Sequence, residues 1–193
     1  PSGSRCNRTE ISPFSVNFTA LSRRFRTAPV RQRGSKRILA SGTSFCQRHP
    51  SPFAAAALEY SSIIGAPTAD VFRWHEQPGA LAALTPAALV RIEQREGGIS
   101  DDGRVTVSIG LGRARLHWAM RHYGYANGRR FCDEQVAGPF AVWRHAHLFE
   151  SLGSSQTLYE DRIEFAVVRR RALNRLAAAV LRPLLQIAFA HRH

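Results

Sequence analysis

Residues 128–150 read GRRFCDEQVAGPFAVWRHAHLFE. This stretch decides the fold, because two runs of alternating apolar and polar residues flank Gly138-Pro139-Phe140, a sequence typical of a chain reversal. Successive side chains of a strand point to opposite faces. The stretch therefore predicts an antiparallel hairpin, one face of which carries Phe131, Asp133, Gln135, Trp143, His145, His147 and Phe149.

The same alternation extends outward from this hairpin in both directions. Val105, Val107 and Ile109, for example, alternate with polar residues, and glycine-rich turns separate the runs. Short strands joined by such turns are typical of an antiparallel meander. The predicted strands lie at residues 89–95, 104–109, 115–121, 130–136, 142–150 and 157–167.

The two ends of this region complete the pattern. Leu58–Gly65 predicts a first strand, and two short helices follow, one with Pro67 at its first position and one over Ala80–Leu84. Residues 171–191 predict a long helix that must be covered by the sheet, because one of its faces is apolar. That face comprises Leu173, Leu176, Ala177, Val180, Leu181, Leu184 and Ile187 or Ala188.

The element order is strand, two short helices, six strands and a long helix, which is the order of the helix-grip fold. We therefore predict an α+β domain over residues 58–193. In it, a curved antiparallel sheet of about seven strands wraps on the long C-terminal helix and encloses a pocket for an apolar small molecule. Residues 1–57 are Ser- and Arg-rich without sustained periodicity, which predicts a disordered basic segment.

The formal net charge of +13 belongs mostly to the N-terminal segment. Residues 1–58 contain ten Lys or Arg and one acid, whereas residues 59–193 contain seventeen and thirteen. The segment is interpreted in three ways: an organelle transit peptide, a nucleic-acid-binding arm, or a solvated or non-native tail. Nucleic acid is disfavoured as a partner, because few aromatic residues interleave with the basic ones.

The apolar stretches and the cysteines of the sequence indicate where in the cell the protein is expected. The longest stretch without Lys, Arg, Asp or Glu is Gln77–Val90, 14 residues, and a spanning helix needs about 20 mostly apolar residues. Cys6, Cys46 and Cys132 are far apart and form no CxxC motif, so we expect no disulfide framework and no zinc site. The cytoplasm is the predicted location, or an organelle if residues 1–52 are a transit peptide.

Polar residues share the inward face of the last three predicted strands. If the hairpin turn centres on Pro139, the cross-strand pairs are Gln135–Trp143, Asp133–His145 and Phe131–His147. A few convergent polar groups in an apolar wall are typical of ligand sites. The predicted ligand-binding residues are Trp74, His75, Trp118, Asp133, Gln135, Phe140, Trp143, His145, His147 and Asp161.

Each of these groups has a plainer interpretation. The aromatic residues pack in the core of many proteins, and buried polar groups often only satisfy one another. The candidate catalytic residues are His145 and Asp133. His145-x-His147 with Asp133 could also bind a metal, but this pattern on a sheet is a weak signal, and we predict no metal and no cofactor.

Several segments resemble the START-like (SRPBCC) superfamily, in particular a cyclase/dehydrase-like subgroup related to polyketide cyclases and coenzyme-Q-binding proteins. The resemblance covers about residues 58–193. It is carried by APTADVFRWHEQPGALAALTP (66–86), by the 128–150 stretch, by LYEDRIEF (158–165) and by FAHRH (189–193). In some relatives this domain is fused to a short-chain-dehydrogenase-like epimerase domain.

Three functions follow as expectations. The first is binding of a hydrophobic small molecule such as a lipid, quinone, isoprenoid or polyketide-like compound. The second is a cyclase or dehydratase activity with His145 as the base and Asp133 orienting it. The third is an accessory role for an epimerase- or reductase-like partner.

Overall fold

The computed structural model describes residues 56–85 and 87–190. They form the predicted α+β helix-grip fold, with seven strands and a long last helix among the described residues. The elements in chain order are β1 (Ala56–Ile64), α2 (Thr68–Glu76), α3 (Ala80–Leu84), β2 (Val90–Glu96), β3 (Arg104–Leu111), β4 (Ala114–Ala126), β5 (Arg130–Ala137), β6 (Val142–Ser151), β7 (Thr157–Ala166) and α4 (Arg171–Ala190).

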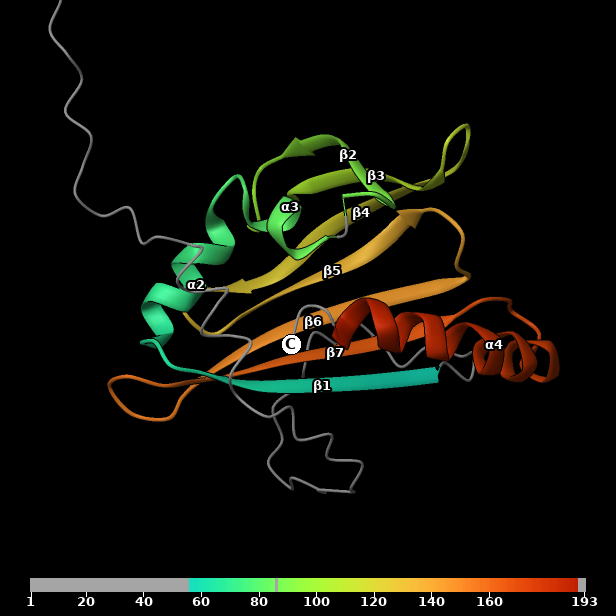
Figure 1. Ribbon diagram of the computed structural model, residues 1–193. Coiled ribbons are helices and arrows are strands. Elements are labelled where there is room, and N and C mark those ends of the chain that lie inside the picture. The colour runs from blue at the N-terminus through green and yellow to red at the C-terminus, as the bar shows by residue number, and fades with distance from the viewer. Residues whose placement is uncertain (1–55, 86, 191–193) are drawn as a thin grey trace, which may run out of the picture.

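The seven strands form one curved sheet in the order β1-β7-β6-β5-β4-β3-β2, and every neighbouring pair is antiparallel (Figure 1). Strands β2 to β7 follow the chain as a meander, as predicted. Strand β1 pairs with β7, so the two ends of the domain lie side by side. This pairing makes β1 an edge strand and places β7, β6 and β5 side by side inside the sheet.

The concave face carries two aromatic and aliphatic clusters. The first lies under α3 and α4, because Leu81 of α3 and Leu181 and Leu185 of α4 pack against it. Its buried members are Leu58, Val105, Val107, Trp118, Trp143, Ile163, Phe165 and Ala178. The second lies by α2 and contains Ile64, Val71, Phe72, Ile99, Phe131, Phe149 and Tyr159.

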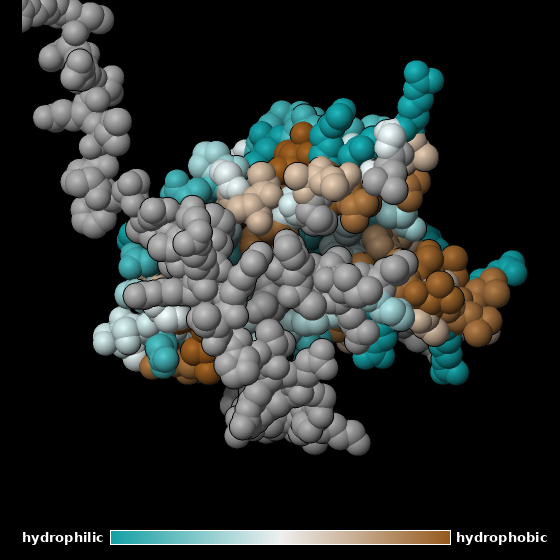
Figure 2. Space-filling view, viewed as in Figure 1, coloured by the Kyte–Doolittle hydropathy of each residue, from teal (hydrophilic) through white to brown (hydrophobic). Residues whose placement is uncertain are grey.

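Helix α4 presents a different face to the sheet from the one predicted. Leu173, Leu176 and Val180 are 52, 70 and 75% exposed, and an apolar patch lies over α4 in Figure 2. Asn174 and Ala178 are buried instead.

The physical reason for this rotation is a side-chain hydrogen bond at the start of α4. Asn174 Oδ1 accepts from the Val167 N–H at 2.7 Å and from the Val168 N–H at 3.4 Å. These bonds turn the face bearing Asn174, Ala178 and Leu181 toward the sheet. A periodicity argument counts apolar residues and gives no weight to a buried asparagine, so the predicted face was wrong for Leu173, Leu176 and Val180 and correct for Leu181. The side chains of Leu184, Ile187 and Ala188 lie outside the described ones.

Other predictions concern the cysteines and the N-terminal segment. Cys132, fully buried in β5, is disulfide-bonded, which the expectation of no disulfide framework did not foresee. Sequence separation says nothing of whether two cysteines approach each other in space. The predicted disordered segment lies outside the described residues, apart from the start of β1. No helix in the described part of the chain has the length and apolarity to span a membrane.

Candidate functional site

Two carboxylates and two imidazoles meet at the middle of the concave face. Asp133 comes from β5, His145 and His147 from β6, and Asp161 from β7. The register pairs Asp133 with His145 and His147 with Asp161, and the predicted pairing of Phe131 with His147 is also found. All four side chains point inward because each strand keeps its period of two up to this point.

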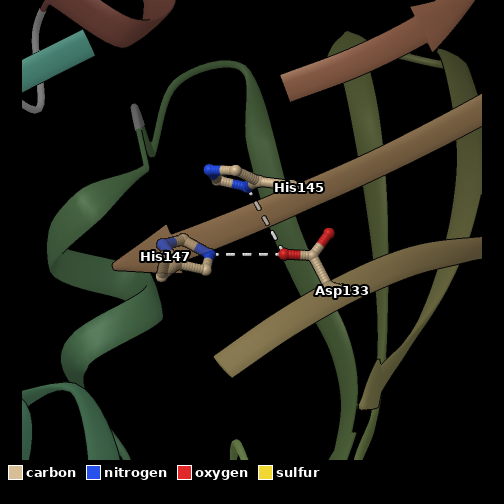
Figure 3. Close-up of side chains that lie close together, drawn as sticks. All are labelled: Asp133, His145 and His147. Atoms are coloured by element: carbon tan, nitrogen blue, oxygen red, sulfur yellow. Dashed lines mark hydrogen bonds and ion pairs between the residues drawn. The ribbon is translucent and has the colours of Figure 1, made fainter. Parts of the chain in front are cut away.

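These four side chains form a closed ring in which each imidazole bridges both carboxylates. His145 Nδ1 lies 3.4 Å and His147 Nε2 3.3 Å from the same oxygen, Asp133 Oδ2 (Figure 3). The other nitrogens, His145 Nε2 and His147 Nδ1, lie 3.0 and 2.8 Å from Asp161 Oδ1. We call this group the Asp–His ring.

Two further residues orient the ring from outside. The Tyr159 hydroxyl donates to Asp161 Oδ1 at 2.7 Å and lies 2.9 Å from His147 Nδ1. The Trp143 indole N–H donates to Asp133 Oδ1 at 3.3 Å. Each carboxylate therefore has a neutral donor besides the imidazoles, as buried charged groups require.

Burial and charge set the protonation of the ring. Its four side chains are 0–6% exposed. Burial opposes the positive charge of His145, but the carboxylates of Asp161 and Asp133 outweigh it and raise the pKa of His145 to about 9. Burial also opposes the charge of Asp161, yet His145 and His147 hold the pKa of this carboxyl well below its usual range, and the same groups lower the pKa of Asp133.

The protonation of His145 bears on the predicted catalytic role. With a pKa of about 9, the imidazole is protonated at neutral pH and has no lone pair with which to accept a proton. In this state His145 can donate a proton or a hydrogen bond. The raised pKa thus makes His145 a better acid than base at neutral pH, and the predicted role as general base stays a prediction.

Three of the predicted aromatic residues, Trp118, Phe140 and Trp143, form a second group beside the Asp–His ring, at the β5–β6 turn. The ring centroids of Trp118 and Trp143 lie 4.7 Å apart at an edge-to-face angle, and Phe140 packs within 5.3 Å of both. Gln135 joins both ends of its amide to the backbone of Phe140, at 2.6 and 3.2 Å. Because those bonds occupy the amide, Gln135 stabilises the turn.

Trp74 and His75 lie at the other end of the concave face, on α2. Trp74 is half-buried, and His75 is buried with its Nδ1 2.9 Å from the Val71 carbonyl oxygen. The His75 ring packs against Phe149 and Tyr159, at centroid distances of 4.9 and 5.2 Å. This residue therefore belongs to the core around α2, and Tyr159 and Phe131 connect it to the Asp–His ring.

A pocket of about 380 Å³ lies outside this region. It is lined by Ala69, Phe72, Arg73, Glu76, Asn127 and Gly128, so it lies between α2 and the β4–β5 turn. The cavity predicted between the sheet and α4 stays a prediction.

Sequence reasoning missed two residues of the site. His122 faces Asp133 across β4 and β5 and is buried, which lowers its pKa. Its spacing of two from Met120 and four from Trp118 placed it on the inward face, but the predicted strand ended at residue 121. Tyr159 lies two residues from Asp161, so a strand places both on one face, yet nothing in the spacing shows that its hydroxyl reaches Asp161.

No protein-family model matches this chain, and no curated protein does. Solved structures do match it. The Zhui aromatase/cyclase from Streptomyces sp. R1128 is 13% identical, with a TM-score of 0.56 over 71% of this chain and 88% of that one. Norcoclaurine synthase from Thalictrum flavum, in complex with dopamine and hydroxybenzaldehyde, is 12% identical, with a TM-score of 0.56 over 82% and 94%.

A third neighbour is Ara h 8.0201, 12% identical with a TM-score of 0.53 over 72% of this chain and 95% of that one. The three neighbours are helix-grip proteins of the SRPBCC type. This chain has their fold. At such low identity the likeness extends to the fold alone, and the chemistry of the site must be argued from its own residues.

Proposed function

We propose that the protein binds a hydrophobic small molecule carrying a hydrogen-bond acceptor, on the concave face between the sheet and α4. One observation carries this proposal. The indole N–H of Trp118 is buried and has no hydrogen-bond partner among the described residues. A buried donor without a partner costs about 1–3 kcal/mol, and an acceptor on a bound ligand would recover that cost.

The surroundings of Trp118 support an apolar ligand. Around the buried cluster lie apolar side chains that are only partly buried, namely Tyr60, Leu81, Val90, Ile92, Ile109, Met120, Phe140, Val167, Leu181 and Leu185. They come from the strands, from α3 and α4 and from the loops, and apolar walls with a few polar groups are typical of ligand sites. Among the neighbours in fold, norcoclaurine synthase has been solved with dopamine and hydroxybenzaldehyde.

The test is native mass spectrometry of the purified full chain, followed by affinity measurements on the extracted molecule or on a fluorescent apolar probe such as anilinonaphthalene sulfonate. Trp118→Phe keeps an aromatic ring and removes the donor. We expect it to weaken binding of the extracted molecule about tenfold, the effect of one hydrogen bond of about 1.4 kcal/mol. Tyr125→Phe, at the end of β4, is the matched control, because it removes a donor that bonds Glu76 at 2.8 Å and keeps the aromatic ring. If no molecule is bound, or if Trp118→Phe and Tyr125→Phe behave alike, the proposal fails.

A cyclase- or dehydratase-type activity is the second candidate, and the Asp–His ring favours it. Since His145 is protonated at neutral pH, the role we propose for it is that of an acid that polarises a carbonyl, with Asp133 orienting it. His145→Gln should then abolish turnover of a polyketide-like substrate while binding persists. Unchanged turnover would remove this candidate.

The resemblance to a cyclase/dehydrase-like subgroup also motivates a proposed accessory role for an epimerase- or reductase-like partner. Co-purification of the full chain with a short-chain-dehydrogenase-like protein would support that role. A chain that elutes alone at its own mass from its native source would count against it.

A further inference from the structure

We propose that Asp133, His145 and His147 bind one divalent first-row transition-metal ion of the zinc or iron(II) class, with Asp161 holding both histidines from the opposite side. The three donor atoms lie within 4.8 Å of one another, and all three side chains are buried. The proposal is independent of the hydrophobic ligand. In the sequence alone, the same three residues were only a weak signal for a metal site.

The distances within the Asp–His ring fall into two classes. The contacts to Asp161 Oδ1, at 2.8 and 3.0 Å, are close ion-pair contacts, near the roughly 2.7–2.9 Å of charge-assisted hydrogen bonds. The contacts to Asp133 Oδ2, at 3.3 and 3.4 Å, are longer. Donor atoms about 2.0–2.1 Å from a tetrahedral zinc ion stand about 3.3 Å apart, which is the spacing on the Asp133 side.

The ring nitrogens can supply the lone pairs that an ion needs. A neutral imidazole carries one N–H, and its other nitrogen carries a lone pair. In the metal-free ring a proton joins His147 Nε2 to Asp133 Oδ2 at 3.3 Å, and a metal ion would take the place of the protons on this side. The N–H groups of both histidines would then lie on the Asp161 side, where His145 Nε2 and His147 Nδ1 are 3.0 and 2.8 Å from Asp161 Oδ1.

Asp161 has the position of a metal-site supporting residue. A histidine that binds a metal usually donates its second N–H to a carboxylate, which fixes the tautomer and the ring orientation. Here one carboxylate oxygen serves both histidines and is itself fixed by the Tyr159 hydroxyl. The free oxygen of Asp133 accepts from Trp143, so the proposed ligand carboxylate is oriented too.

The charge of the ring fits a divalent ion. Asp133 and Asp161 contribute two negative charges in a buried site, and a divalent cation with two neutral imidazoles makes the group electrically neutral. Three protein ligands, two nitrogen and one oxygen, suit zinc or iron(II) and leave a coordination position for water or a ligand.

The experiment uses the full chain, stripped with a chelator and then titrated with Zn²⁺ against a chromophoric competitor, or with Fe²⁺ without oxygen. Co²⁺ serves as a spectroscopic probe. We expect one ion per chain and a Co²⁺ absorption spectrum of nitrogen and oxygen ligands without thiolate charge transfer. His147→Ala should reduce the affinity at least 100-fold, and Asp161→Asn about 10–100-fold.

His117→Ala is the matched control, because His117 is an exposed histidine on β4. The metal affinity of this variant should equal that of the wild type. If His147→Ala does not fold, as judged by circular dichroism, the wild-type Co²⁺ spectrum and Asp161→Asn still decide the matter. The proposal is overturned if the wild type binds no stoichiometric ion, if binding shows thiolate charge transfer, or if a folded His147→Ala or Asp161→Asn binds as tightly as His117→Ala.

Discussion

Replacing Asp161 with asparagine should cost the metal-free protein about 3–5 kcal/mol of unfolding free energy. Asp161 is fully buried, and one of its oxygens receives three contacts, from Tyr159 at 2.7 Å, His147 at 2.8 Å and His145 at 3.0 Å. Asparagine keeps the shape and one acceptor oxygen but removes the charge. Loss of one partner from a buried ion pair leaves the other charge without compensation, which costs about 3–5 kcal/mol.

The assay is urea unfolding at pH 7 in the presence of a chelator, with the free energy taken from the midpoint and slope of the transition. A domain of this size has about 5–15 kcal/mol of stability, so the expected loss is a large fraction of the total. Glu160→Gln, on the opposite face of the same strand, is the control. Glu160 pairs with Arg162 at 3.0 Å near the surface, and such pairs contribute about 0–1 kcal/mol.

The comparison of the two variants decides whether the ring is an energetically coupled unit. A loss below about 1 kcal/mol for Asp161→Asn, or equal losses for the two variants, would refute the reasoning. The buried ring would then consist of contacts that the chain can exchange for water or for one another without cost.

Three further predictions test the ring, the turn and the start of α4. The pKa of His145 is raised to about 9 in the folded state from about 6.5 in the unfolded chain, so its stabilising contribution is complete below pH 6.5 and is lost as pH rises through 9. Urea unfolding of the metal-free protein should therefore show a loss of roughly 3 kcal/mol between pH 7 and pH 10. An equal loss in His145→Gln would contradict this origin. A methyl group on Gly138 would lie 2.5 Å from the Trp118 ring and 2.7 Å from the Gln135 amide oxygen. Gly138→Ala should therefore lower the unfolding free energy by about 1–3 kcal/mol and lower the melting temperature. Gly65→Ala, with no atom within 4 Å of the added methyl, should change the melting temperature little. Asn174→Ala leaves the Val167 N–H without its 2.7 Å acceptor and should cost about 1–3 kcal/mol in thermal unfolding, and a loss no larger than that of the exposed Arg175→Ala would show that this bond does not fix α4.

Much of the fold could be predicted because the alternation of apolar and polar residues identifies each strand from its own sequence. Alternation along 142–150 and 157–166 assigns a face to every residue, and Gly138-Pro139 fixes one register, from which the Asp133–His145 pair follows. The pairing of β1 with β7 has no such local signal. It came from the order of elements, which is shared by many helix-grip sequences.

The faces of α4 could not be predicted by the same logic. A helix whose apolar residues spread over more than one face has several orientations that bury similar areas. The choice between them is made by Asn174, whose amide oxygen binds the backbone between β7 and α4. One buried hydrogen bond therefore selects the orientation and leaves Leu176 and Val180 exposed.

The orientation of the two imidazoles in the Asp–His ring is a second feature that the sequence does not predict. Strand periodicity places His145 and His147 on one face, but it does not give the rotation of each ring about its side-chain bonds. That rotation decides which nitrogens face Asp133 and which face Asp161, and with them whether protons or a metal ion complete the ring.

Chelation separates these two ways of completing the Asp–His ring in the wild-type protein. If protons alone balance Asp133 and Asp161, a chelator leaves the melting temperature unchanged at any pH. If a divalent ion occupies the ring, removing it costs RT ln(1 + [M]/Kd) of stability, about 4 kcal/mol when the free ion is at 1,000 times its dissociation constant. Protons compete with the ion for the imidazoles, so the stabilisation that the ion provides should shrink as pH falls. Destabilisation by chelator that is present in His117→Ala and absent in His147→Ala would place the ion among these side chains.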